Sequence, residues 1–213
     1  MRDSIGNGHH GTIHGNVKWV PADDAFGETT DSEDENQPKP TDTSGAPEPS
    51  EKPNWALAFD GRDDHVEIPT ISKTIPEQYT VESWVTPASV NTMSVIDQHV
   101  GGAIYAHAAQ NHQWQFELKE NELQTQLNSG ASLAADRRVH LAGVRNGSEV
   151  TIFVDGLLKN NRTIQKVPTT RVAKEDFLGA SPHPSSGTLH PLLHGQIDAV
   201  QISNTGRDIE SFG

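Results

Sequence analysis

The sequence contains no cysteine among its 213 residues. The fold is therefore held together without disulfide bonds, and a cysteine nucleophile is excluded. The absence leaves the cellular compartment open. Cytosolic proteins seldom carry disulfides, and many exported bacterial proteins also lack cysteine.

Extended apolar segments are missing as well. No run of about 18 apolar residues occurs, so the sequence predicts no membrane-spanning helix. The opening residues MRDSIGNGHH lack the apolar stretch of a signal peptide. We expect the chain to be a fragment of a longer polypeptide, or to begin at a misassigned start, with any targeting signal upstream of Met1.

Basic residues are few relative to acidic ones. The chain has 16 lysines and arginines against 29 aspartates and glutamates, which gives a net charge of −13. Such a surface repels the phosphates of nucleic acids and anionic lipids, so neither nucleic acid nor membrane is an expected partner. Neutral glycans are not repelled, and divalent cations are attracted.

Much of the negative charge lies in residues 21–54, which contain ten acidic residues, two basic residues and six of the 13 prolines. A segment of this composition buries too little apolar surface to offset its ordering entropy. We interpret it as a disordered acidic linker inserted into a surface loop, between residues 1–20 and the main body at 55–213. The alternative is a tail that concentrates calcium or binds a basic partner.

The main body has the pattern of an all-β protein. Short apolar or alternating runs are separated by turn residues, and no stretch has sustained helical periodicity with caps. Asn146-Gly147 and Asp155-Gly156 are typical of tight hairpin turns. Ten or so short strands predict two antiparallel sheets packed as a sandwich. The predicted strands lie near 55–60, 64–68, 79–87, 93–97, 102–107, 112–118, 122–127, 139–146, 149–155, 176–180 and 192–203.

One stretch combines an apolar strand with a carboxylate-rich turn. The sequence WALAFDGRDDHVE, from Trp55 to Glu67, reads as strand, tight acidic turn and strand, which predicts a β-hairpin. Three carboxylates on one turn repel each other unless water or a cation separates them.

This stretch is followed by four others in a recognisable order. They are YTVESWV from Tyr79, VHLAGV from Val139, VTIFVDG from Val150 and GQIDAVQI from Gly195. Together the five resemble the laminin G-like family of concanavalin A-like jelly-roll domains, and residues 3–12 resemble the N-terminal segment of that family. The resemblance implies a two-sheet jelly roll that acts as a non-catalytic recognition module, carbohydrate-binding or adhesive, in a larger extracytoplasmic protein. Its partners would be a glycan or a surface protein.

Two alternatives belong to other functional classes. One is a structural or protein-interaction domain without a small-molecule site. The other is a glycoside hydrolase, since relatives of this fold include glycosidases. A retaining glycosidase needs two carboxyls about 5–5.5 Å apart. The candidates Glu117, Glu120 and Glu122 flank a predicted turn and lack the aromatic context of a sugar cleft. The sequence also has no Gly-x-Ser-x-Gly motif and no phosphate-binding loop, so we do not expect an enzyme.

Calcium is the metal that the acidic residues favour, because it takes six to eight oxygen ligands. One candidate site combines Asp3 and Asn7 with Asp198, on the expectation that the first and last strands pair at one edge. The other is the turn, with Asp60 and Asp63 beside Asp64. The alternative role of these residues is local, because Asp and Asn side chains often accept hydrogen bonds from nearby turn backbone.

A glycan site would need exposed aromatic and amide side chains. Trp114 is the candidate for stacking. It lies next to Gln113 in an amide-rich strand, with Tyr105 and His107 on the neighbouring strand. Core packing is the alternative role for Trp114. Of the other three tryptophans, Trp84 is expected in the core, whereas Trp19 and Trp55 are expected to pack at the two ends of the linker.

Overall fold

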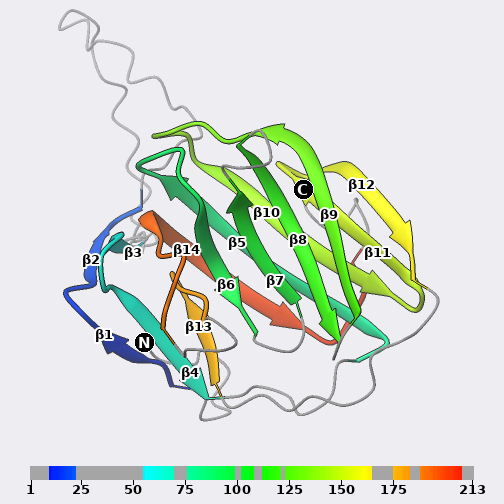
Figure 1. Ribbon diagram of the computed structural model, residues 1–213, viewed down its shortest axis with the longest axis horizontal. Coiled ribbons are helices and arrows are strands. Elements are labelled where there is room, and N and C mark those ends of the chain that lie inside the picture. The colour runs from blue at the N-terminus through cyan, green and yellow to red at the C-terminus, as the bar shows by residue number, and fades with distance from the viewer. Residues whose placement is uncertain are drawn as a thin grey trace, which may run out of the picture.

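The computed structural model describes residues 10–22, 55–69, 76–98, 102–107, 112–120, 123–164, 175–182 and 188–207. Every regular element in these ranges is a β-strand (Figure 1). No helix in the described ranges is long and apolar enough to cross a membrane. The proposed linker lies outside the described residues from residue 23 to 54. At its start, Pro21 is still part of a strand.

The strands form two antiparallel sheets of seven strands each, stacked face to face (Figure 1). The sheet that contains β8 has the order β1-β4-β13-β6-β7-β8-β9. We call it the β8 sheet. Its strands are β1 (Thr12–His14), β4 (His65–Pro69), β13 (Glu175–Leu178), β6 (Met93–Asp97), β7 (Gly102–His107), β8 (Gln113–Glu120) and β9 (Leu123–Ser132).

The other sheet, the β5 sheet, has the order β12-β11-β10-β5-β14-β3-β2. Most strands in both sheets coincide with the predicted ones, so the prediction of an antiparallel two-sheet sandwich is confirmed. The strands of the β5 sheet are β12 (Leu157–Thr163), β11 (Glu149–Val154), β10 (Val139–Asn146), β5 (Gln78–Pro87), β14 (His194–Ser203), β3 (Trp55–Asp60) and β2 (Lys18–Pro21).

Two hairpin turns join β10 to β11 and β11 to β12, and their conformations are set by the residues within the turns. At the second turn, Asp155 and Gly156 both have positive φ, 52° and 70°, as a type I′ turn requires. The first turn is one residue later than predicted. Asn146 pairs with Glu149, so Gly147 and Ser148 form the loop, and Gly147 at φ 60° takes the first central position.

The predicted hairpin between β3 and β4 is wrong. The two strands belong to different sheets, so the acidic turn carries the chain across the sandwich edge. The buried carboxylate of Asp64 holds this corner. Its Oδ2 accepts the amide of Asp60 at 2.9 Å, and its Oδ1 accepts the amide of Asn16 at 2.5 Å. These two bonds join the corner to the β1–β2 connection.

The last strand also lies elsewhere than expected. β14 runs through the middle of its sheet, between β5 and β3, whereas β1 is an edge strand of the opposite sheet. The expectation that the first and last strands pair at one edge is therefore wrong for the strands described.

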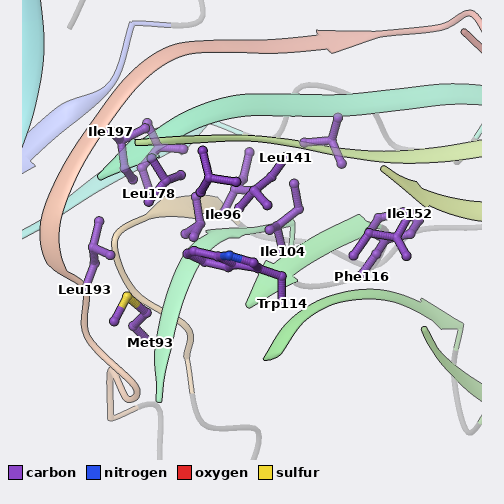
Figure 2. Packing of buried hydrophobic residues seen from close by; sticks show 14 of the residues in the cluster. Met93, Ile96, Ile104, Trp114, Phe116, Leu141, Ile152, Leu178, Leu193 and Ile197 are labelled. Atoms are coloured by element: carbon purple, nitrogen blue, oxygen red, sulfur yellow. The ribbon is translucent and has the colours of Figure 1, made fainter. Parts of the chain in front are cut away.

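The core fills the space between the sheets. Phe116 of β8 packs so closely on β10 that a Cβ at Gly143 would lie 2.2 Å from its ring, which explains the glycine in this strand. Figure 2 shows the centre of this core, with the indole of Trp114 among Met93, Ile96 and Ile104.

Candidate functional site

Trp114 is not available as a stacking surface. Its side chain is 2% exposed and belongs to the core cluster (Figure 2). Trp114, Phe116 and Leu118 alternate along β8 and all face inward. The prediction that Trp114 stacks on a sugar is therefore corrected, because its ring packs against the opposite sheet.

The other three residues of the predicted site lie on β7 and β8. The backbone register pairs Gln113 with His107, and Tyr105 with Gln115. Gln113 alternates with Trp114 along β8, so its side chain lies on the opposite, outer face of the β8 sheet.

This outer face carries a set of amides and one carboxylate that we name the amide face. Gln115 of β8 lies opposite Asn128 of β9, and Glu117 lies opposite Gln126. The amide face consists of Gln113, Gln115, Glu117, Gln126 and Asn128. The sequence signal for it is the alternation of polar residues with core residues in both strands.

Hydrogen bonds between the two strands fix these side chains. The amide nitrogen of Gln126 donates to Glu117 Oε2 at 2.9 Å, and the amide nitrogen of Gln115 donates to Asn128 Oδ1. Gln113 Oε1 accepts the backbone amide of Gly130 at 3.1 Å. Planar polar groups are therefore held in fixed directions.

The amide face has a buried centre and an accessible rim. Gln115 and Glu117 are 1% and 4% exposed, whereas Gln126 is half-buried and Asn128 is exposed. A ligand would therefore first meet the β9 side chains.

The outer face of the β5 sheet is built on ion pairs around Trp84. Trp84 was expected in the core, but it lies opposite Asp198 and His140 on the outer face. The guanidinium of Arg138 lies 4.7 Å from its ring centroid, and the His140 ring lies at 5.0 Å. Arg138 also forms an ion pair with Asp198, at 2.8 Å.

A second charged group joins the C-terminal segment to this face. Glu82 contacts His140 at 3.3 Å and forms an ion pair with Arg207. The hydroxyl of Thr80 donates to the carbonyl of Thr205 at 2.7 Å and accepts the amide of Arg207. The segment after β14 is therefore held against β5 by charge and by backbone hydrogen bonds.

Of the two predicted calcium sites, only the turn has carboxylates that come together in the described residues. Oxygens of Asp60, Asp63 and Asp64 lie within 4.8 Å of one another, and Asp60 and Asp63 are exposed. Asp64 already accepts two backbone amides. The turn therefore has two exposed carboxylates, whereas the third carboxylate already accepts backbone hydrogen bonds.

The terminal site does not fit a cation at Asp198. Arg138 places its positive charge 2.8 Å from this carboxylate and so repels a second cation. Asp3 and Asn7 lie outside the described residues.

Two tryptophans are exposed at the far edge of the β5 sheet. Trp19 on β2 and Trp55 on β3 are 52% and 46% exposed. Trp19 pairs with Leu57, so Trp55 lies diagonally across the ladder on the same face. These two indoles are the exposed aromatic surface that β8 lacks.

Two stacked antiparallel sheets of seven strands have the architecture of jelly-roll domains. The chain belongs to the concanavalin A-like lectin/glucanases superfamily, which its sequence matches over residues 60–208, more than half of its length. No curated protein sequence matches the chain.

Solved structures with a similar fold come from several kinds of protein. Domain 4 of AbnA, an extracellular GH43 arabinanase of Geobacillus stearothermophilus crystallised with arabinotriose, is 17% identical, with a TM-score of 0.65 over 99% of this chain and 89% of that one. A heptameric SAP-like pentraxin of Limulus polyphemus is 12% identical, with a TM-score of 0.58 over 75% and 80% of the two chains.

A third similar structure is that of botulinum neurotoxin type C, whose cell entry depends on two ganglioside molecules. It is 13% identical, with a TM-score of 0.64 over 98% of this chain. The chain spans 46% of that toxin chain. At these identities the likeness concerns the fold alone.

Proposed function

We propose that the chain is a non-catalytic recognition module that binds carbohydrate through the amide face, as part of a larger extracytoplasmic protein. One observation carries this proposal. Neighbouring amides and a carboxylate on β8 and β9 are hydrogen-bonded to each other and accessible at Gln126 and Asn128. The arabinanase domain crystallised with arabinotriose supports it, because it has the same fold over nearly the whole chain.

The chemistry of the amide face matches that of sugar hydroxyls. A hydroxyl both donates and accepts a hydrogen bond, and so does a side-chain amide. Asn128 uses its oxygen to accept from Gln115, and within the described part of the chain its amide nitrogen has no partner. Gln126 likewise uses one of its two N–H groups on Glu117. Fixed donors at neighbouring positions suit the adjacent hydroxyls of a sugar ring.

Binding by such groups is expected to be weak. Each neutral hydrogen bond contributes a net free energy of about 1 kcal/mol. A few of them give a Kd in the millimolar range, which corresponds to about 4 kcal/mol.

Titration of the intact chain with cell-wall and storage oligosaccharides, followed by NMR chemical shifts, tests the proposal. We expect saturable shifts for at least one ligand, and loss of binding in Gln126→Ala combined with Asn128→Ala. Gln201→Ala is the matched control, because Gln201 is an exposed amide on β14 in the other sheet. Tight binding to a protein without any glycan binding would instead support an adhesive or structural domain.

A glycoside hydrolase is the second candidate, and one observation favours it. Asp97 and Glu117 lie in one row across β7, separated by Ala103. Two strand spacings are about 9.5 Å, close to the upper end of the range of about 6.5–9.5 Å for inverting glycosidases. Both carboxyls are buried, however, at 1% and 4% exposure.

Recognition is preferred because a sugar cannot reach carboxyls that are covered in this way. Each also accepts a side-chain hydrogen bond, from Ser181 to Asp97 and from Gln126 to Glu117. An assay of reducing ends released from β-glucans and galactans is expected to show no turnover. Turnover that is lost in Glu117→Gln would replace recognition with hydrolysis.

Calcium at the acidic turn is a separate proposal. Asp60 and Asp63 would hold the ion, with backbone and water oxygens completing its shell. At a calcium concentration equal to Kd, binding stabilises the fold by about 0.4 kcal/mol. We expect a small rise in melting temperature with millimolar calcium, which Asp60→Asn combined with Asp63→Asn abolishes. Identical melting curves with calcium and with chelator would show that the acidic turn binds no calcium.

A further inference from the structure

We propose that the glycan bound at the amide face is an anionic polysaccharide, and that strand β12 binds its carboxylate or sulfate groups. This inference rests on the proposed function and names its ligand class. It begins from β12, an edge strand whose seven residues are all exposed. The strand contains Lys159 and Arg162 and no acidic residue.

Strand β12 adjoins the amide face although it belongs to the other sheet. β9 of the β8 sheet lies against β12 at one side of the sandwich (Figure 1). The side-chain amide of Asn160 on β12 donates to the backbone carbonyl of Asn128 at 2.9 Å. Asn128 also contributes its side chain to the amide face, so the two surfaces are continuous at this residue.

Arg162 lies on the side of β12 that looks toward β9. Asn160 pairs with Ile152 and Arg162 pairs with Val150, and both partners on β11 are core residues. Asn160 and Arg162 therefore share one face of β12. The hydrogen bond of Asn160 identifies that face as the one next to β9. Two residues along a strand correspond to about 6.6 Å, so Arg162 lies about that far along β12 from Asn160, the residue that bonds to Asn128.

The basic groups of β12 are not neutralised by Glu149, the acidic residue of the neighbouring strand β11. Glu149 pairs with Thr163, on the opposite face of the strand from Arg162, and its carboxylate accepts the side-chain amide of Asn161 at 3.1 Å. Within the described part of the chain, neither Lys159 nor Arg162 has an ion pair. A guanidinium in this state forms paired hydrogen bonds with a carboxylate or sulfate.

Strand β12 is basic although the chain has a net charge of −13. At physiological salt, charges more than about 8 Å apart are largely screened, so a ligand at β12 responds mainly to the charges close to it. On the strand itself these charges are Lys159 and Arg162.

A sugar polymer fits this surface better than a nucleic acid does. Neither β9 nor β12 contains an aromatic residue, so these two strands lack the rings on which single-stranded bases stack. It offers instead amides for hydroxyls beside a cation for an acidic substituent.

Calorimetric titration of the intact chain with three matched oligosaccharides tests this inference. The probes are an oligogalacturonate, the same oligomer as its neutral methyl ester, and a sulfated oligosaccharide of similar length. We expect one acidic probe to bind about tenfold more tightly than the methyl ester at 50 mM NaCl. This preference should shrink at 200 mM NaCl.

Variants locate the charge that is responsible. Lys159→Ala combined with Arg162→Ala should lower the affinity for the acidic probe to that for the methyl ester, and leave the affinity for the ester unchanged. Lys18→Ala is the matched control, because Lys18 is an exposed base on β2, at the opposite edge of the same sheet. It should leave both affinities unchanged.

The outcomes separate this inference from the proposed function. Equal binding of acidic and neutral probes, or an equal loss in the Lys18 variant, overturns the inference and leaves glycan binding intact. Failure of every probe and every other glycan to bind overturns both. Binding by the sulfated probe alone supports the inference and identifies sulfate as the anion.

Discussion

Strands β5 and β8 each carry one tryptophan, and the two side chains point in opposite directions. Trp114 of β8 faces the core with Phe116 and Leu118. Trp84 of β5 faces outward, on the side of the strand that carries Thr80 and Glu82. Tryptophan thus packs between the two sheets in β8, whereas in β5 it lies on the outer face beside an ion pair.

The difference shows that a tryptophan does not decide which face of its own strand is buried. In β5 the core phase is set by Tyr79, Val81 and Val85, all of which belong to the core cluster. Trp84 is out of phase with them and is therefore turned outward. A large ring on the outer face can then support Arg138 through a cation–π contact, as no aliphatic side chain can.

The largest expected effect is the difference in stability between variants that lack one or the other tryptophan. Trp114→Ala should lower the free energy of unfolding by about 3–5 kcal/mol, because it leaves a large cavity between the sheets. Trp84→Ala should cost only about 1–2 kcal/mol, since it removes a half-buried ring and one cation–π contact. Urea unfolding of both variants measures the difference, and equal losses would contradict the distinction between core and surface.

An intermediate effect is expected from the polar contacts of the two outer faces, an ion pair on the β5 sheet and a hydrogen bond on the β8 sheet. Arg138→Met should cost about 2–3 kcal/mol, because it removes the cation from Asp198, a carboxylate with little solvent access. Gln126→Ala on the amide face should cost about 1 kcal/mol, since the lost hydrogen bond starts from a neutral amide.

Replacing both partners of the ion pair provides the control. Arg138→Met combined with Asp198→Leu should recover most of the loss, as apolar replacements of a buried pair often do. A double variant no more stable than Arg138→Met would mean that the contacts of Arg138 with Trp84, rather than the ion pair, determine its contribution.

The smallest effect is expected from removing one hydroxyl group on either face of β5. Ser83 is fully buried on the core side, and its hydroxyl has no hydrogen-bond partner in the described part of the protein. Ser83→Ala should therefore stabilise the fold by about 1 kcal/mol, because it removes a buried unpaired polar group.

Thr80→Val is the matched change on the outer face. It removes a hydroxyl that bonds to Thr205 and Arg207, and should destabilise by about 1–2 kcal/mol. Thermal unfolding of the two variants should give shifts of opposite sign. A destabilised Ser83→Ala would indicate that this hydroxyl has a partner after all.

The fold was predictable where local patterns determine it. Alternation identified most strands of both sheets, and Asp155-Gly156 identified the turn before β12. The strand β12 itself was missed because Asn160 and Asn161 belong to a residue type that is depleted in strands. Its place is determined by the hairpin turn and by pairing with β11.

The connection of β3 to β4 was not predictable from local sequence. A tight acidic turn can join two paired strands or carry the chain between two sheets, and the same residues serve both. Here the choice depends on Asp64, which binds the backbone of Asn16 across 48 positions of sequence. Such a contact has no local signature.

Of the candidate site, the predicted stacking residue was wrong, because Trp114 lies in the core. The phase of β8 could have placed Trp114 inside, because Phe116 and Leu118 follow it at every second position. The partners on β9 depend on the strand register, which the sequence of β8 alone does not determine.

The central position of β14 has a consequence for synthesis of the chain. Until residues 194–203 leave the ribosome, the β5 sheet exists as two separate parts, with β5 the open edge of one and β3 the open edge of the other. Both edges offer unpaired backbone groups to any neighbouring strand. The nascent domain therefore stays open to aggregation until almost its last described residues are made, and a chain truncated before His194 would remain in that state.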